Sequence, residues 1–333
     1  MKRLYQKLRR MRRREEELRT DGGEVARESV ATEGGFDTSL LRSEFVQSLP
    51  FWLPPFLLMG FFVYGAIGWN LVISLTDFGG LQLPTYEVSA FDLEMYRQAF
   101  SDPTFWTAAR NTIVLMVAFT VVCLVVGLLL AILVDQGIRF ENTFRTVYLL
   151  PMSLSFVVTA KFWAWMYNFN NGMINVTLRK LGLDFLALKW ISNPDLKLAA
   201  VVFALIWQFS GYAMVVYLAG LRAIPTEHYE AARVDGANTL RMYWRVIVPQ
   251  LRASTVSAAV VLMVFALKAF DFLYVMFGDN PGPAADILAT MMYREAFGSN
   301  QWAYGSAIAI VLFVMALAVV TPYLYSEYRR GEL

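Results

Sequence analysis

Two groups of residues in this 333-residue chain have types and spacings that could do chemical or mechanical work. The first is the segment EAARVDGANTLRMYWRVIVP at 230–249, which lies between two apolar runs. The second is the pair Lys268 and Asp271, which stand three residues apart inside an apolar run. Ionisable groups in such a run are costly unless they face a cavity or a partner. Both groups therefore require a functional explanation.

Motifs for catalysis and for metal binding are absent from the sequence. No Gly-Lys dipeptide occurs, so there is no GxxxxGK[ST] phosphate-binding loop, and neither HExxH nor CxxC occurs. Cys123 and His228 are each the sole residue of their type, which excludes an intrachain disulfide and a histidine metal cluster. We expect no catalytic, cofactor-binding or metal-binding residue, so transport against a gradient would need energy from a partner or a coupled ion.

The elements that must position these residues are membrane-spanning helices. The chain is 57% hydrophobic and 17% charged, whereas soluble domains are usually about 25% charged. Runs of about 20 apolar residues cross a bilayer, and backbone polar groups in lipid must pair within their own segment. The sequence therefore predicts an all-α integral membrane protein with a permease domain over 46–328. Its six predicted spans cover 51–75, 112–134, 144–169, 198–221, 253–277 and 302–325.

The distribution of basic residues predicts the orientation of these spans. The stretch KRLYQKLRRMRRR at 2–14 precedes the first span, and loops that carry Lys and Arg stay on the cytoplasmic side. Both termini are then cytoplasmic, with a basic, glycine-containing, flexible tail over 1–45 and a short tail over 329–333. The predicted outer loop at 170–197 departs from this bias, because it carries Arg179, Lys180, Lys189 and Lys197.

The segment between the fourth and fifth spans, residues 225–249, is predicted to lie on the cytoplasmic side and to form a helix–turn–helix; it is called the EAA segment below. Thr226 is suited to cap the first helix, and Gly236 can adopt the left-handed conformation that breaks it. Asn238 can cap a second helix, which Pro249 ends. Small alanine side chains on the first helix suit insertion into a groove of a partner.

This pattern resembles the EAA signature of permease subunits in binding-protein-dependent ATP-binding-cassette importers. That signature reads Glu-Ala-Ala, three residues, Gly, nine residues, then Ile-x-Leu-Pro, and here Val246 and Val248 replace Ile and Leu. In that family the segment is a coupling helix that docks into the ATPase subunit. The resemblance implies that closure of the ATPases is transmitted through the following residues: Glu230, Ala231, Ala232, Asp235, Gly236 and Pro249.

Four further segments resemble the carbohydrate branch of these importers, the group of the maltose transporter's larger permease subunit. They are WQFSGYAMVVYLAGLRAIP (207–225), LKAFDFLYVMFGDNPG (267–282), YREAF (293–297) and YGSAIAIVLF (304–313). The sequence departs from the family at GDNPG, where members carry glycines and then proline, and at Ala253, where many carry another proline.

The resemblance implies the type I importer permease fold in the plasma membrane of a bacterium or archaeon. It implies five kinds of partner: a second related permease, two ATPase subunits that bind ATP and magnesium, an extracytoplasmic sugar-binding protein, the lipid bilayer and the sugar itself. The sugar would be a mono- or oligosaccharide, with a glucoside as one candidate. No nucleic acid is expected, and the chain is expected to have no enzyme activity of its own.

Six residues are predicted to line the path of the sugar, where hydroxyl groups need hydrogen bonds and pyranose faces can stack on aromatic rings. They are Gln208, Tyr212, Lys268, Asp271, Tyr274 and Phe277. For Lys268 and Asp271 an internal salt bridge that only packs the subunits satisfies the cost of burial equally well.

Two other functions remain open from the residues alone. An ion-coupled secondary transporter could use Lys268 and Asp271, although no inverted repeat is visible. A membrane-embedded glycosyltransferase would need clustered Asp or His at a membrane surface, which the sequence lacks.

Overall fold

The computed structural model describes residues 44–80, 91–137 and 139–330, and in these ranges it is helical and contains no β-strand. This agrees with the predicted all-α class. The predicted N-terminal tail lies almost wholly outside the described residues. The helices are α2 (Glu44–Met59), α3 (Gly65–Ser74), α4 (Glu94–Ser101), α5 (Pro103–Asp135), α6 (Glu141–Leu149), α7 (Phe156–Met166), α8 (Met173–Lys180), α9 (Pro194–Ala223), α10 (Thr226–Val234), α11 (Thr239–Met242), α12 (Val248–Gln250), α13 (Arg252–Leu267), α14 (Phe270–Phe277), α15 (Leu288–Tyr293) and α16 (Trp302–Arg330).

The chain forms two compact units, 1–65 and 66–333. In the first unit the described part is α2, followed by a π-helical turn at Gly60–Tyr64. Its apolar side chains are largely exposed, with Phe51 at 83% and Phe61 at 75%. Exposed apolar side chains suit a helix surrounded by lipid or by another membrane subunit. The second unit contains the remaining helices and a buried core.

The described part contains four helices that are long and apolar enough to cross a bilayer alone. They are Ser48–Ser74, Pro103–Asp135, Pro194–Ala223 and Trp302–Tyr325. Two bent pairs pass the same test when each pair counts as one span: Glu141–Ser153 with Phe156–Met166, and Thr239–Gln250 with Arg252–Leu267. Counting both pairs makes six spans, the number predicted from the sequence.

The second span begins at Pro103, whereas hydropathy predicted a start at 112. Asp102 accepts a hydrogen bond from the Thr104 backbone N–H at 2.8 Å, and Pro103 occupies the first turn of the helix. An aspartate N-cap and a proline in the first turn both favour helix initiation. The extra turns are too polar for a hydropathy criterion to include.

The third span was predicted as one helix over 144–169, and this is wrong. The chain bends by 98° between Glu141–Ser153 and Phe156–Met166. Pro151 lies in a 3₁₀ turn before the bend, and Ser155 then caps α7 by accepting a hydrogen bond from the Val158 N–H at 3.3 Å. A proline without an N–H and a serine cap together end one helix and start another.

The fifth span was predicted to be continuous over 253–277, and this too is wrong. α13 ends at Leu267, and a turn at Lys268 and Ala269 separates it from α14. No glycine or proline marks this break. Ala269 in the break and Phe272 in the first turn of α14 are fully buried. The break between α13 and α14 is therefore packed into the core.

α5 and α9 approach each other closely at the centre of the second unit. Gly127 permits this approach, because a Cβ atom there would collide with the side chain and backbone of Ala213. A core cluster of aromatic and aliphatic residues surrounds the contact, with Phe119 on α5, Trp163 on α7 and Phe209 on α9. Close packing of this kind leaves little freedom for α5 and α9 to move relative to each other, and the other core helices pack around them.

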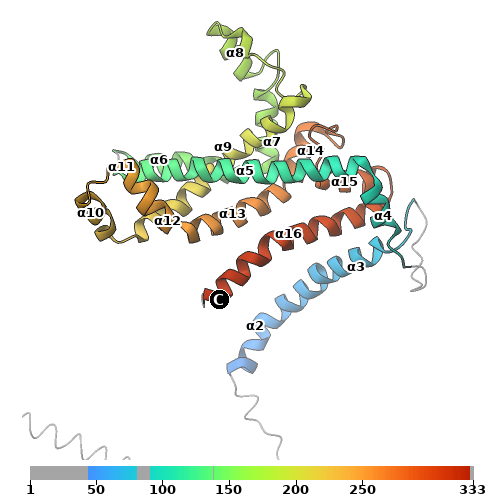
Figure 1. Ribbon diagram of the computed structural model, residues 1–333. Coiled ribbons are helices and arrows are strands. Elements are labelled where there is room, and N and C mark those ends of the chain that lie inside the picture. The colour runs from blue at the N-terminus through green and yellow to red at the C-terminus, as the bar shows by residue number, and fades with distance from the viewer. Residues whose placement is uncertain (1–43, 81–90, 138, 331–333) are drawn as a thin grey trace, which may run out of the picture. The chain divides into compact units, whose positions relative to one another are not determined.

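The two ends of α5 carry different structures (Figure 1). α10, α11 and α12 lie near the end that contains Asp135, and α4 and α15 lie near the end that begins at Pro103. The segment 230–249 and the 278–298 connection therefore occupy opposite ends of the second unit.

Candidate functional site

The predicted helix–turn–helix of the EAA segment is confirmed. α10 ends at Val234, and Gly236 adopts a left-handed conformation with φ of +76°. Asn238 caps α11 by accepting a hydrogen bond from the Arg241 backbone N–H at 2.8 Å. The turn therefore depends on the two residues that the sequence singled out for it.

Both outer boundaries of the segment differ from the prediction. Thr226 is the first residue of α10 rather than its cap, because Pro225 has the extended backbone of the N-cap position. The second helix includes a π-helical turn at Tyr243–Ile247 and continues through Pro249 to Gln250. Pro249 lies in the first turn of α12, where a missing N–H costs little, and the chain bends only at Leu251.

The three residues of the Glu-Ala-Ala signature point in different directions. Ala232 is 5% exposed and packs in a core cluster that also contains Val134 of α5 and Leu221 of α9. Glu230 and Ala231 are exposed. One alanine therefore holds α10 against the bundle, and the neighbouring alanine and glutamate are available to a partner.

Three large apolar side chains of the same segment are exposed, and the sequence analysis did not select them. They are Val234 at 87%, Leu240 at 78% and Trp244 at 73%. Apolar residues in a polar connection between two spans were the available signal. Like Ala231, these side chains are exposed at this end of the second unit.

A cluster of charged residues lies at the end of α9, directly before this segment. Arg222 forms an ion pair with Glu141 at the start of α6, and Arg145 pairs with the same carboxylate. Asp135 at the end of α5 lies 4.0 Å from the Arg222 Nε. Arg222 is about half exposed, so each pair contributes little to stability. The ion pairs nevertheless join residues of α5, α6 and α9 directly before the EAA segment.

Tyr229 connects α10 to this cluster. Its ring packs edge-on against Tyr243 at 6.4 Å, and its hydroxyl lies 3.5 Å from the Leu221 carbonyl oxygen. Burial raises the pKa of Tyr229 to about 12, and the nearby Asp135 carboxylate acts in the same direction. Tyr229 is therefore a neutral hydrogen-bonding group at any physiological pH.

The predicted path residues in the fifth span lie at its break. Lys268 is exposed at the end of α13, and Asp271 and Tyr274 are exposed on α14, three residues apart and so on one face. Within the described part of the chain, no ion pair joins Lys268 to Asp271 at 4.0 Å or less. The structure therefore does not form the internal salt bridge that was the alternative.

Contacts with aromatic rings hold Tyr274 and Phe277 on α14. Tyr274 stacks on Phe270 with ring centres 5.3 Å apart and meets Tyr293 at 5.1 Å. Phe277 is half-buried, and the Lys197 Nζ lies 4.4 Å from the centre of its ring. Tyr274 is the more accessible of these two residues: it is 36% exposed, so a sugar could reach its ring.

The two path residues predicted on α9 are placed differently. Gln208 is 2% exposed, and its side-chain amide donates a hydrogen bond to the Leu154 carbonyl oxygen at 2.9 Å. It thus supports the bend in the third span and lines no open path in this conformation. Tyr212 is half-buried against the core cluster of α5, α7 and α9. The structure therefore brings together Lys268, Asp271 and Tyr274 but not the α9 pair.

A polar network orders the opposite end of the second unit, and the sequence analysis did not anticipate it. Asp286 accepts hydrogen bonds from Arg294 Nη2 at 2.8 Å and from the Thr290 hydroxyl at 2.7 Å. Burial by itself would lower the pKa of Arg294, but the Asp286 and Glu295 carboxylates raise it on balance. A cavity of 490 Å³ is lined in part by Asp286, Arg294 and Glu295. In the described part of the chain, no group of three or more His, Cys, Asp or Glu residues could hold a metal ion.

Comparison with known proteins supports the resemblance found in the sequence. Residues 123–327 match the family described as "Binding-protein-dependent transport system inner membrane component". The chain is 57% identical to the xylose/arabinose import permease protein XacH of Haloferax volcanii, over 88% of this chain and 92% of that protein. It is 28% identical to the trehalose/maltose transport system permease protein MalF of Thermococcus litoralis, over 72% and 80%.

The fold is also that of a solved importer. A chain of the bacterial alginate ABC transporter, solved in complex with its alginate pentasaccharide-bound periplasmic protein, superposes with a TM-score of 0.73 at 20% identity. The match covers 88% of this chain and 96% of that chain. The chain therefore belongs to the family of binding-protein-dependent transport system inner membrane components.

Proposed function

We propose that this chain is the sugar-translocating permease subunit of an ATP-driven importer, and that its EAA segment receives the movement of an ATPase subunit. One observation carries the proposal: the segment is anchored by buried Ala232 while Glu230 and Ala231 face outward. The side chains of Val234, Leu240 and Trp244 in the same segment are exposed as well. Exposed apolar side chains beside charged ones, at the end of a membrane bundle, suit contact with another protein.

The proposed assembly supplies what this chain lacks. Two ATPase subunits bind ATP and magnesium, and a second, related permease completes the transmembrane part. A solute-binding protein delivers sugar at the opposite end, near Asp286 and Arg294. Both termini and the EAA segment face the cytoplasm in this arrangement, in agreement with the basic residues that precede the first span. The chain itself is a transport component and not an enzyme.

Sugar is the proposed substrate class because the relatives are named for sugars. The Haloferax volcanii relative is named for xylose and arabinose, so these pentoses are the first to test. The break in the fifth span presents the Lys268 ammonium, the Asp271 carboxylate and the Tyr274 ring on an exposed surface. These groups can donate to hydroxyls, accept from them and stack on a sugar ring. We place the path between this surface and the second permease.

The two other functions considered from the residues are not favoured. Membership of the binding-protein-dependent family accounts for the EAA segment, which an ion-coupled carrier or a glycosyltransferase would not need. Lys268 and Asp271 remain unpaired with each other, so nothing in their geometry indicates an ion-coupling pair.

Charge reversal at Glu230 tests the coupling role. The complete importer with Glu230→Lys is expected to assemble in the membrane but to lose xylose uptake, and the binding protein is expected no longer to stimulate ATP hydrolysis. The matched control is Glu94→Lys, which reverses an exposed charge on α4 at the opposite end. Normal uptake and stimulated hydrolysis in Glu230→Lys would reject the coupling role.

A second substitution tests the path. Asp271→Asn keeps the size of the side chain but removes its charge, and we expect a changed rate or a changed preference between xylose and arabinose. Asp279→Asn, also exposed and just beyond α14, is the control. An effect of Asp271→Asn on assembly alone, with unchanged transport per assembled complex, would assign Asp271 to packing.

A further inference from the structure

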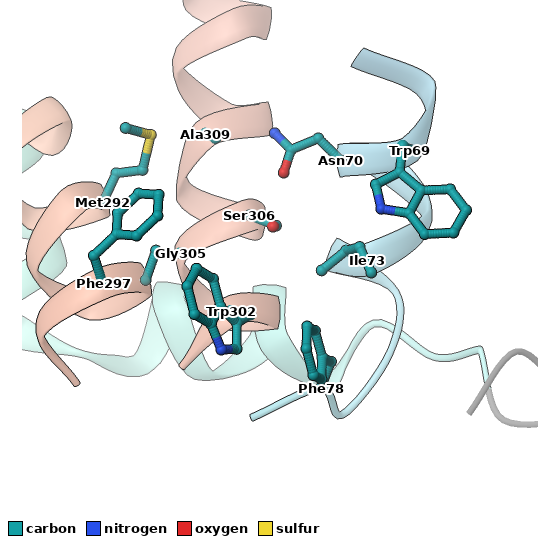
Figure 2. A pocket seen from close by; sticks show the side chains of 11 residues that line it. Trp69, Asn70, Ile73, Phe78, Met292, Phe297, Trp302, Gly305, Ser306 and Ala309 are labelled. Carbon is teal, nitrogen blue, oxygen red and sulfur yellow. The ribbon is translucent and has the colours of Figure 1, made fainter. Parts of the chain in front are cut away.

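A cavity of 440 Å³ lies between α3, α16 and the π-helical turn Arg294–Gly298, all within the second unit (Figure 2). Its size is within the range of sites that hold small ligands. Its walls are mainly aromatic and aliphatic, and the residues that matter here are Trp69, Asn70, Phe297, Trp302, Ser306 and Ala309. The EAA segment and the path residues do not line it.

One end of the cavity is closed by contacts between the chain after α3 and the chain before α16. The Gly80 N–H donates to the Asn300 carbonyl at 2.7 Å, and the Ala303 N–H donates to the Phe78 carbonyl at 2.9 Å. The rings of Phe78 and Trp302 stack with centres 6.2 Å apart. These contacts hold the ends of the two helices together, so the cavity is a built feature of the fold.

Two polar side chains enter this apolar space from opposite walls. Figure 2 shows the Asn70 amide reaching from α3 toward α16 and the Ser306 hydroxyl directed from α16 into the same gap. Both residues are half-buried, and neither side chain is hydrogen-bonded to another residue in the described part of the chain. Lipid hydrocarbon offers no partner to an amide or a hydroxyl. A ligand with oxygen acceptors would satisfy both groups.

The depth of these two groups indicates which molecule supplies the acceptors. Asn70 lies one helical turn before the end of α3 at Ser74, and Ser306 lies one turn after the start of α16 at Trp302. The four residues that separate each group from its helix end correspond to about 6 Å along the helix axis. Tryptophan side chains at the ends of spans mark the boundary between headgroups and hydrocarbon, and Trp69 and Trp302 lie at this level.

We propose that the cavity binds a membrane glycerolipid of the leaflet that faces away from the EAA segment. The Asn70 amide N–H and the Ser306 O–H donate to ester, ether or hydroxyl oxygens of the glycerol region. The first part of one chain lies against Phe297 and Ala309. A sugar fits less well, because two polar side chains cannot satisfy the many hydroxyls of a free saccharide.

Photolabelling of the complete importer in nanodiscs tests this proposal. The nanodiscs contain phosphatidylcholine and a small share of a phosphatidylcholine with a diazirine near the glycerol end of one chain. Labelled peptides of this subunit are then mapped by mass spectrometry. The wild-type chain is expected to be labelled in 66–80 and in 292–309. Loss of one hydrogen bond corresponds to about a fivefold loss of affinity, so Asn70→Leu and Ser306→Ala should each reduce labelling by about that factor.

Two additional variants separate a site from general lipid contact. Ala309→Phe keeps both polar groups but fills the space, and it should also reduce labelling. Thr321→Ala removes an exposed hydroxyl near the other end of α16 and should leave labelling unchanged.

Four results would overturn the proposal. The first is absence of labelling at these peptides in the wild type. The second is labelling of Asn70→Leu, Ser306→Ala and Ala309→Phe equal to that of the wild type, and the third is displacement of the label by xylose. Crosslinking of a benzoylphenylalanine at position 309 to the second permease instead of to lipid would identify a protein-filled groove and would also reject it. None of these results bears on the coupling role of Glu230.

Discussion

Gly236 provides a quantitative test of how the EAA segment is held in shape. Its φ of +76° lies in the left-handed region, and no atom lies within 4 Å of the position that a Cβ atom would occupy. Substitution therefore creates no clash, and its whole cost is the conformational cost of the backbone. That cost is about 1–2 kcal/mol for an ordinary L-residue and smaller for asparagine, which tolerates this region better.

The expected order of function at position 236 is Gly, then Asn, then Ala, then Val. A cost of about 1–2 kcal/mol changes an equilibrium by a factor of about 5–30. A strained turn relaxes unless the ATPase holds it, so docking of the ATPase should weaken by up to this factor in Gly236→Ala and by less in Gly236→Asn. Helix propensity alone would favour Ala over Asn, so the order separates the two explanations.

The assay is binding of the ATPase subunit to the permease pair in detergent, together with sugar uptake in cells. Gly68→Ala is the matched control, because Gly68 also has open space around its missing Cβ atom but has no positive φ. We expect Gly68→Ala to leave both measurements unchanged. Equal affinity for Gly236 and Ala variants, or weaker binding for Asn than for Ala, would refute the reasoning.

Three further substitutions test the fold. Gly127→Leu is expected to prevent close packing of α5 on α9, because a side chain there meets Ala213, and the variant should lose its folded membrane form in fluorescence-detected size-exclusion chromatography. Gln208→Leu removes the hydrogen bond to the Leu154 carbonyl and should cost about 1 kcal/mol, measured as a lower Tm, with Ser210→Ala as control. Burial would raise the pKa of Asp102, but hydrogen bonds at the start of α5 lower this pKa on balance. The Asp102 carboxylate therefore stabilises the fold above pH about 4, and this stabilisation is lost as the pH falls further. Asp102→Asn should abolish this part of the acid dependence of the Tm.

The basic residues that predict the orientation of the spans have one exception, and the structure shows internal hydrogen bonds for two of the four residues concerned. The loop at 170–197 carries four basic residues on the side where few are expected. Arg179 donates to the backbone carbonyl oxygens of Phe169 and Asn170, and the Lys197 ammonium donates to the Pro281 carbonyl oxygen. These residues are engaged in internal contacts. Their presence therefore reflects the architecture of the loop, which no count of charges can reveal.

The helical turn of the EAA segment could be predicted because its causes are local. A left-handed glycine and an asparagine cap act within four residues, so Gly236 and Asn238 could be assigned from the sequence. The break in the fifth span at Lys268 and Ala269 could not, because no glycine or proline marks it. The exposed position of Asp271 and the burial of Gln208 likewise depend on which helices pack together.

The sequence by itself determined the class of the molecule, its apolar runs of membrane length and the helix–turn–helix of the EAA segment. Apolar runs of membrane length and a short motif with fixed spacing encode these properties along the chain. The tertiary structure alone decided which signature alanine faces the core, where two of the spans bend, and that Asn70 and Ser306 share one cavity. These properties arise from packing between residues far apart in the sequence, where the burial of one side chain depends on the positions of all its neighbours.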